Sequence, residues 1–452
     1  MSENVAENKM GTMPVGKLLA NMAIPMIASM MVQALYNVVD SIYISRISES
    51  AVTALSLAFP VQNMMIAFSM GVAVGVNSLL SRSLGAKDQK TANKSAGNGV
   101  TLLLFAMVIL VAFGIFGAHP YFAMQSDVEE TVYNGTVYVR IISILCLGSF
   151  SEMLLERLLQ ATGRTVYSMI TQGTGAIINI ILDPIFIFGL LGAPKMGIAG
   201  AAVATVIGQW IAAGLALFFN IKKNPDIQLS VKDLPIDKEV VGKILVVGVP
   251  SMVMMAIGSI MNFGMNQILQ GFSETATGVF GIYYKLQSFI FMPVFGLNGA
   301  TISIVAFNYG SKNKERMMKA VKLSTITAAC IMTVGLLLFM FIPDILLGIF
   351  NPSDYFLEIG TVALRIICIH FPLAAVCIAV GGVFQAMGNG TYSTIVSLGR
   401  QLVVLLPAAY LLSLTGNINM VWWAFVIAEF ASLLLTIFFF RKIYKERIAI
   451  LG

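Results

Sequence analysis

The chain has 452 residues, of which 58% are hydrophobic and 11% are charged. Soluble domains carry roughly 25% charged residues, so this composition excludes a soluble globular protein and indicates a protein that lies in a membrane. The net charge of +6 does not indicate a nucleic-acid partner. The basic residues are spread over several segments that flank apolar ones. At such places they set the orientation of the chain in the membrane and contact anionic lipid headgroups.

Apolar stretches of about 20 residues, long enough to cross a bilayer as helices, recur along the chain. We place twelve, centred near residues 30, 65, 105, 145, 178, 208, 255, 290, 332, 370, 404 and 430. Continuous apolar runs such as residues 102–116 lack the alternation of a membrane barrel. The sequence therefore predicts an all-α membrane protein with twelve transmembrane helices.

The chain is an internal duplication. The sequence Gln-Ala-Thr-Gly at 160–163 returns as Gln-Ala-Met-Gly at 385–388, and the same shift of 225 positions carries Pro25 onto Pro250. A membrane protein made of two like halves predicts a site between them that is served from each side in turn. We expect two six-helix lobes related by a pseudo-twofold axis along the membrane normal.

Lys and Arg gather in alternate loops. By the positive-inside rule, both termini and the central linker are therefore expected to be cytoplasmic. We expect the protein to lie in the cytoplasmic (inner) membrane. The expected division is a tail at 1–16, a lobe at 17–221, a linker at 222–243, a lobe at 244–442 and a tail at 443–452.

The first predicted helix carries a proline and two polar residues. Pro25, like Pro250 in the seventh helix, removes a backbone hydrogen bond and favours a bend. Tyr36 and Asp40 lie four positions apart, so both project from one face of the helix. An ionised side chain within a membrane span costs roughly 2.5 to 3.5 kcal/mol and therefore indicates function.

The fourth helix carries Glu152 and Glu156, with Gln160 at its end. The duplication does not repeat these carboxylates, which favours an acidic, cation-attracting wall of a substrate cavity in the first lobe only. A local pairing of Glu156 with Arg157 or Arg164 is an equally good interpretation.

The fifth helix places Asn179 and Asp183 four apart, and Pro184 follows. Pro184 frees a helix carbonyl one turn earlier. Thr205 in the sixth helix is a further candidate ligand. Asp183 lies at about the same depth as the carboxylate of the first helix, so a shared site is expected.

Carboxylate, amide and phenol oxygens are hard ligands that suit a proton or a small alkali cation. We therefore predict a cation-coupling site at Asp40, Asn179 and Asp183, with H⁺ or Na⁺ as the coupling ion. The sequence does not choose between the two ions. In the alternative interpretation, both aspartates reach interfacial water or cap neighbouring groups.

The second half has different polar residues. Lys285 in the eighth helix faces the cavity or extends towards the interface. Arg140 and Arg365 occupy equivalent positions in the two halves, which favours a structural role. His370 is more typical of a hydrogen-bonded core residue than of a proton relay.

We expect no cofactor and no enzymatic activity. The four cysteines fall within spans at no metal-ligand spacing, and neither a nucleophile with its base nor a nucleotide-binding motif is found. The 27 Met and 29 Phe residues are side chains that repack around ligands of varied shape.

Three motifs carry a family resemblance: Leu-Gly-Ala-Lys-Asp at 84–88, the repeated Gln-Ala-x-Gly, and Asn-Ile-Ile-Leu-Asp-Pro at 179–184. With the two six-helix halves, they make the chain similar to the multidrug and toxic compound extrusion family over nearly its whole length. The resemblance implies export of organic cations and drugs in exchange for protons or sodium by two alternating lobes.

The resemblance also implies that Asp40, Asn179 and Asp183 are the family's coupling residues. One chain already completes the two-lobed site, so we expect the protein to work as a monomer. The seventh and tenth helices lack the carboxylates of one family branch, so the chain is more similar to the branch that relies on the first lobe. A flippase for lipid-linked precursors, from the same superfamily, is the alternative function. Such flippases tend to have cationic cavities, and here the first half is acidic.

Overall fold

The computed structural model describes residues 8–350 and 353–451. Among these residues the regular structure is helical throughout, and no strand occurs. Eleven helices of the described part are long and apolar enough to cross a membrane, and a bent pair with an angle of 48° brings the total to twelve. The predicted all-α fold with twelve spans is confirmed.

The first lobe holds the first six spans, followed by a linker. Its helices are α2 (Val15–Ser45), α3 (Glu49–Gly85), α4 (Gln89–Ala112), η1 (Phe113–Gly117), α5 (Ala118–Ala123), the bent pair α6 (Glu129–Ile144) and α7 (Leu147–Ala161), α8 (Thr165–Phe188), η2 (Leu190–Gly192) and α9 (Ile198–Lys223). A short helix, α1 (Lys9–Thr12), precedes them, and η3 (Val231–Asp233) lies in the linker.

The second lobe repeats this order. Its helices are α10 (Lys238–Gln270), α11 (Glu274–Gly310), α12 (Lys314–Phe341), α13 (Pro343–Gly348), α14 (Asp354–Ile367), η4 (Cys368–His370), α15 (Phe371–Ala386), α16 (Gly390–Leu398), η5 (Gly399–Leu405), α17 (Leu406–Ser413), α18 (Ile418–Ile443) and η6 (Tyr444–Ile448). The 3-10 segment η4 and the π-helical segment η5 interrupt the tenth and eleventh spans.

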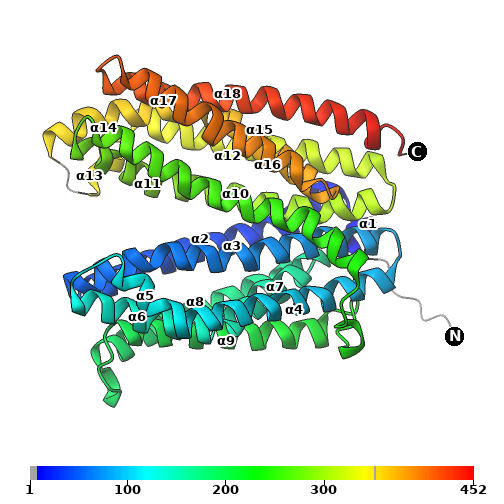
Figure 1. The fold of residues 1–452 in the computed structure, drawn as a ribbon. Coiled ribbons are helices and arrows are strands. Elements are labelled where there is room, and N and C mark those ends of the chain that lie inside the picture. The colour runs from blue at the N-terminus through cyan, green and yellow to red at the C-terminus, as the bar shows by residue number, and fades with distance from the viewer. Residues whose placement is uncertain (1–7, 351–352, 452) are drawn as a thin grey trace.

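The two lobes lie close together at the end of the molecule that holds both termini, and their ribbons diverge towards the other end (Figure 1). We call these the terminal end and the distal end. At the terminal end, Ser78 Oγ donates to the Gln385 carbonyl at 2.6 Å, and Arg82 Nη1 donates to the Met387 carbonyl at 3.3 Å. These bonds join α3 to the last turn of α15 and to the residue that follows it.

Two helices pack into the core of the opposite lobe. The terminal half of α2, including Met22 and Met26, belongs to the apolar core of the second lobe. The terminal half of α10, including Ile244, belongs to the core of the first lobe. Because α2 and α10 are equivalent in the duplication, the exchange is symmetrical and ties the lobes together at the terminal end.

Glycines permit these helices to cross closely. A Cβ atom at Gly71 of α3 would lie 2.8 Å from the Gly248 carbonyl oxygen of α10. The equivalent glycine, Gly296 of α11, would place a Cβ 2.9 Å from the Ile27 Cα of α2. Real Cβ atoms do not approach backbone so closely, so both crossings require glycine.

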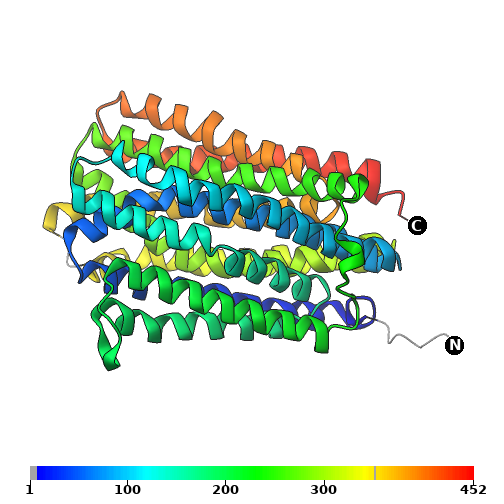
Figure 2. The same ribbon diagram turned by 60° about the horizontal axis from the view of Figure 1, so that its bottom comes forward.

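The helices reach further than the expected boundaries of the lobes. In the expected linker at 222–243, α10 begins already at Lys238, because Asp237 Oδ1 accepts from the Glu239 and Val240 amides as an N-cap. In the expected tail, α18 and η6 continue the helix to Ile448. The linker runs along the terminal end from one lobe to the other (Figure 2).

The prolines expected to bend helices all lie inside them. Pro25 lies within α2, Pro184 within α8 and Pro250 within α10, and each helix continues through its proline. The backbone hydrogen bond that each proline lacks leaves a point where the helix bends at lower cost.

Candidate functional site

Two carboxyl groups meet between α2 and α8. The side chains of Asp40 and Asp183 are hydrogen-bonded to each other. Asp183 is fully buried, and one oxygen of Asp40 is buried without any hydrogen-bond partner. Two carboxylates in contact cannot both be ionised at little cost, so this contact favours a proton shared between them.

Asn179 connects the pair to α9. In the amide orientation that satisfies both of its ends, the Asn179 nitrogen donates to Asp183 Oδ2 at 3.2 Å. Its oxygen accepts from the hydroxyl and the main-chain nitrogen of Thr205, both at 3.2 Å. Asn179 and Asp183 share one face of α8 because they lie four residues apart. The sequence-predicted residues of the fifth and sixth spans are thus in direct contact.

Two tyrosines complete the surroundings of the pair. Tyr36 lies within electrostatic range of both aspartates and of Glu152. Tyr138 of α6 also lies within range of both aspartates, and its hydroxyl accepts from Gln62 Nε2 at 2.7 Å. The sequence reasoning missed Tyr138 and Gln62 as site residues. The repetition of Gln62 at position 287 was the available signal for the latter.

A second acidic pair lies on α7, towards the terminal end. Glu156 is buried and accepts from the Thr171 hydroxyl of α8 at 2.8 Å. Glu152 interacts electrostatically with Glu156. One turn further on, Gln160 Nε2 donates to the Ser168 hydroxyl at 2.9 Å. Polar contacts between α7 and α8 therefore continue from the aspartate pair to the terminal end of the first lobe.

The basic neighbours of this acidic pair have other partners. Arg157 Nη1 donates to Gln160 Oε1 at 2.9 Å and interacts with Glu156 only at longer range. Arg164 forms an ion pair with Asp226 of the linker at 3.0 Å. Among the described residues no ion pair joins Glu156 to either arginine, so the acidity of α7 is not cancelled by a direct contact.

Three basic side chains that the sequence analysis singled out lie away from the aspartate pair. Lys285 of α11 belongs to the second lobe and is exposed. Arg140 and Arg365 are exposed as well, and Arg365 Nε donates to the Met340 carbonyl at 3.2 Å. The structure does not bring Lys285 to the carboxylates of the first lobe.

The second lobe holds a buried polar cluster that the sequence reasoning did not find. Glu429 of α18 is buried, and Arg400 Nη1 donates to its Oε2 at 3.2 Å. His370 is buried beside Glu429 and is hydrogen-bonded to Tyr283. A single carboxylate in an otherwise apolar stretch was the signal for Glu429.

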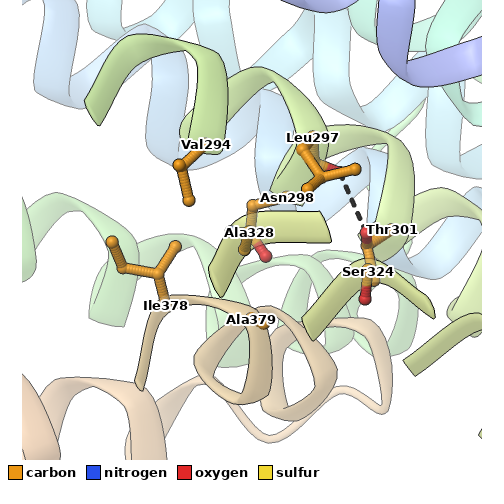
Figure 3. Close-up of a pocket in the computed structure, with 8 residues that line it drawn as sticks. All are labelled: Val294, Leu297, Asn298, Thr301, Ser324, Ala328, Ile378 and Ala379. Carbon is orange, nitrogen blue, oxygen red and sulfur yellow. Dashed lines mark hydrogen bonds between the residues drawn. The ribbon is translucent and has the colours of Figure 1, made fainter. Parts of the chain in front are cut away.

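A tight gap lies between α11, α12 and α15 in the second lobe (Figure 3). It has no room for a water molecule. It is lined by Val294, Leu297, Asn298, Thr301, Ser324, Ala328, Ile378 and Ala379. We therefore do not take it as a binding site.

A larger apolar pocket of about 320 Å³ lies between α3, α4 and α5 in the first lobe. It is lined by Pro60, Val61, Met64, Phe68, Ala106, Ile109, Leu110, Phe113 and Tyr121. Met64 and Phe68 lie on the same helix face as Gly71, which packs against α10. The pocket therefore lies on the side of α3 that faces the second lobe.

The donor set around Asp40 fits a small hard cation as well as a proton. The described residues contain no group of three metal-ligating side chains of the His, Cys, Asp and Glu type. A sodium ion needs only oxygen ligands. The unpartnered oxygen of Asp40 and the Asp183 carboxyl offer such ligands, whereas the Asn179 oxygen is already bonded to Thr205 in this orientation.

Two six-helix lobes joined at one end, with carboxyl groups buried inside them, define a multi-pass membrane transporter of the two-lobed class. The chain belongs to the MatE family, whose family model matches residues 25–185 and 250–411. The two matched segments begin 225 positions apart, in register with the duplication.

Curated relatives of the chain include the multidrug export protein MepA of Staphylococcus aureus (strain bovine RF122 / ET3-1). It is 25% identical over 421 residues, which cover 92% of this chain and 91% of that protein. MepA of Staphylococcus haemolyticus is 25% identical over 423 residues, which cover 93% of this chain and 92% of that protein.

Solved structures of similar fold include the outward-facing conformation of a multidrug resistance MATE family transporter, with a TM-score of 0.90 and 25% identity. A MOP superfamily transporter from Pyrococcus furiosus also gives a TM-score of 0.90 at 25% identity. Both alignments cover 99% of this chain and 99% of the other chain.

Proposed function

We propose that the protein is a secondary active exporter of lipophilic and cationic drugs, and that it exchanges them for H⁺ or Na⁺ by alternating access. The observation that carries the proposal is the hydrogen-bonded pair Asp40 and Asp183, buried in the lobe that also holds Glu152 and Glu156. The multidrug export proteins among its relatives support the substrate class.

The coupling ion binds at the aspartate pair. With one proton the pair carries a single negative charge, and a second proton or a sodium ion removes that charge. Asn179 and Thr205 orient Asp183, and Tyr36 and Tyr138 separate the pair from water. A bound organic cation and the coupling ion therefore compete for the same negative charge, which is the condition for exchange.

The terminal end faces the cytoplasm, as the distribution of Lys and Arg indicates. The lobes touch at this end and diverge at the distal end (Figure 1), so the conformation is the outward-facing one. Ions then reach Asp40 and Asp183, which lie near the distal ends of α2 and α8, from outside. Substrate leaves by the same opening, and one chain suffices because it contains both lobes.

Lipophilic parts of the substrate bind in the apolar pocket beside Met64 and Phe68. Its volume of about 320 Å³ is within the range of sites for small molecules. Thioether and aromatic side chains adapt to ligands of different shape, which accounts for a broad substrate range. The acidic residues of α7 favour positive charge in the same ligands.

The flippase alternative is not favoured. Its substrates carry pyrophosphate, and the first lobe presents Glu152, Glu156 and the aspartate pair, which repel such anions. The relatives named above are multidrug exporters. No enzymatic step is needed in the proposed cycle.

The test uses purified protein in liposomes, a fluorescent lipophilic cation, and either a pH gradient or a sodium gradient. We expect one gradient to drive movement of the cation in the wild type and in Asp127→Asn, a control at an exposed position. Asp183→Asn should abolish the gradient-driven movement. Export by Asp183→Asn at the wild-type rate would overturn the coupling role, and identical movement without any gradient would overturn exchange.

A further inference from the structure

The buried cluster of the second lobe joins four spans. Arg400 of η5 donates to Glu429 Oε2 of α18 at 3.2 Å, and His370 Nδ1 of η4 lies 3.6 Å from the same oxygen. The other ring nitrogen of His370 is hydrogen-bonded to the Tyr283 hydroxyl of α11 at 3.3 Å. These four residues form one chain of polar contacts inside the lobe.

The cluster is incomplete as it stands. The His370 and Glu429 side chains are 5% and 3% exposed, yet His370 Nδ1 and Glu429 Oε1 have no hydrogen-bond partner. The hydroxyls of Ser432 and Thr436, one and two turns further along α18, are also buried, and they contact the Cys377 thiol. Buried polar atoms without partners cost roughly 1 to 3 kcal/mol each, so a further hydrogen bond to His370 Nδ1 or Glu429 Oε1 would stabilise the cluster.

A neutral ring can donate from Nδ1 to Glu429 and accept at Nε2 from the Tyr283 hydroxyl, and one added proton would make the ring a donor to both neighbours. A neutral imidazole has a single N–H, so it donates to only one of its two neighbours. A doubly protonated ring donates from Nδ1 to the carboxylate of Glu429 and from Nε2 to the oxygen of Tyr283. Both neighbours already stand on the correct sides of the ring.

The helices are irregular at the two basic residues of the cluster. His370 ends the 3-10 segment Cys368–His370, and Arg400 lies in the π-helical segment Gly399–Leu405. Such interruptions are frequent at functional sites and at hinges, because the backbone there has alternative hydrogen-bond partners. A change of charge in the cluster thus acts where the tenth and eleventh spans are easiest to rearrange.

The duplication does not repeat the cluster. The positions equivalent to His370, Arg400 and Glu429 in the first half are occupied by Leu, Gly and Ala at 145, 175 and 204. Titratable neighbours that face the cluster from α11, η4 and α15 are Tyr283, Tyr284, Cys368 and Cys377. Phenols and thiols in an apolar interior remain neutral near neutral pH, so only His370, Glu429 and Arg400 decide its charge.

We propose that His370 and Glu429 form a proton-binding site of the second lobe, separate from the aspartate pair of the first lobe. The site takes one proton from water at the imidazole and holds it between His370 Nδ1 and Glu429 Oε2. The charge of the cluster rises from zero, with Arg400 and Glu429 paired, to plus one. Glu429 then interacts with two positively charged side chains, and its ion pair with Arg400 becomes weaker.

The first test is a titration of His370 itself and does not depend on transport. The chain has two histidines, so protein with ¹³C-labelled histidine gives two ring signals, and His119→Gln assigns them. We expect the His370 signal to move in one step between about pH 4 and about pH 8. A signal that stays constant over that range in the wild type would overturn the proposal.

Two substitutions should shift this step in opposite directions. Glu429→Gln removes the negative partner and should lower the proton affinity of His370 about tenfold or more, whereas Arg400→Gln removes the opposing cation and should raise it about as much. A role in packing alone would not produce shifts of opposite sign. Equal steps in the wild type and in both variants would contradict the proposed site.

The second test depends on the proposed function, because it measures the pH dependence of export. His370→Gln should flatten the dependence of the export rate on pH, while His119→Gln should leave it unchanged. A uniform loss of rate at every pH would assign His370 a structural role only. If no export occurs in the wild type, the proposed function fails, and the titration still decides the proton site.

Discussion

Ser78 of α3 and Gln385 of the second repeated motif are joined across the two lobes by a hydrogen bond of 2.6 Å from the serine hydroxyl to the main-chain carbonyl. The bond lies at the terminal end, where Ser303 of α11 also donates to Asn77 of α3 at 3.1 Å. The motif that reveals the duplication therefore takes part in closing one end of the transporter. Any transport cycle that opens this end must break these bonds.

Because α3 and α11 cross closely at Gly85, one added methyl group there should weaken closure of the terminal end. A Cβ atom at Gly85 would collide with the Phe307 carbonyl oxygen. Gly85→Ala should therefore disfavour closure of the terminal end by about 1 to 3 kcal/mol. Gly242→Ala is the matched control, because nothing lies within 4 Å of its added methyl group.

Spin labels at the exposed residues Lys90 and Lys319 would measure this effect, after Cys330→Ser removes the exposed thiol. We expect a longer distance between the labels in Gly85→Ala than in Gly242→Ala. The same distance in both variants would show that closure tolerates the methyl group.

The segment 8–13 crosses the terminal end between the lobes, and we call it the strap. Asn8 Nδ2 donates to the Thr162 carbonyl of the first lobe at 3.2 Å. Arg316 Nη2 of the second lobe donates to the Met10 and Met13 carbonyls at 3.0 and 2.7 Å. Met10 is fully buried, so the strap is part of the closed end.

Arg316→Gln should loosen the strap and lower the free energy of unfolding by about 1 to 3 kcal/mol. It removes the two charge-assisted bonds to the strap and a third bond, from Arg316 Nε to Asn308 at 3.3 Å. Thermal unfolding, with Lys322→Gln at an exposed position as the control, would measure the loss. The same pair of spin labels should also report more frequent opening. Unchanged stability and an unchanged distance between the spin labels would show that the bonds from Arg316 to the strap do not stabilise the closed conformation.

The aspartate pair should behave as one unit. Asp40→Asn and Asp183→Asn should each abolish gradient-driven export nearly as completely as the double substitution, because either change removes the shared charge. Rates in liposomes for the three variants would show this. Additive losses, in which the double variant is far slower than either single one, would contradict a shared site.

Tyr138 should contribute through its hydroxyl. Tyr138→Phe leaves the ring in place but removes the acceptor of Gln62, so we expect export to slow about 5- to 10-fold, equivalent to one hydrogen bond. Tyr133→Phe, at a position 67% exposed, is the control. A full rate in Tyr138→Phe would remove Tyr138 from the candidate site.

An ion pair between the linker and α4 should make the stability of the fold depend on pH. Asp237 forms an ion pair with Lys94 at 2.7 Å, and this hydrogen bond holds the pKa of Asp237 below its usual range. A lowered pKa means that the pair stabilises the fold above the usual range near pH 4 and that this contribution is lost as the pH falls through the lowered pKa.

Asp237→Asn keeps an N-cap for α10 but removes the charge. Its melting temperature should lie below that of the wild type at neutral pH, and the difference should shrink towards about pH 3. A difference that is constant over this range would assign the effect to the cap.

Much of the fold was predictable from the sequence. Apolar stretches of span length and the shift of 225 positions predicted the twelve helices and the two lobes, because a bilayer forces each span to be a long apolar helix. Within one helix, the spacing of four placed Asn179 beside Asp183. The expected convergence of Asp40 and Asp183 rested on equal depth, and the structure places them in contact. Their role as a coupling site stays a prediction.

Only the tertiary structure decided which side chains from different spans meet. Tyr138 lies within electrostatic range of the aspartates, and Arg157 bonds to Gln160 rather than to Glu156. The residues at 283, 370, 400 and 429 form one cluster in the second lobe. Membrane thickness fixes the depth of a residue along its own helix, but rotation about that axis and the choice of neighbour depend on the packing of all the helices. The sequence of each span therefore determines how deep its residues lie in the membrane, but not which residues of other spans they contact.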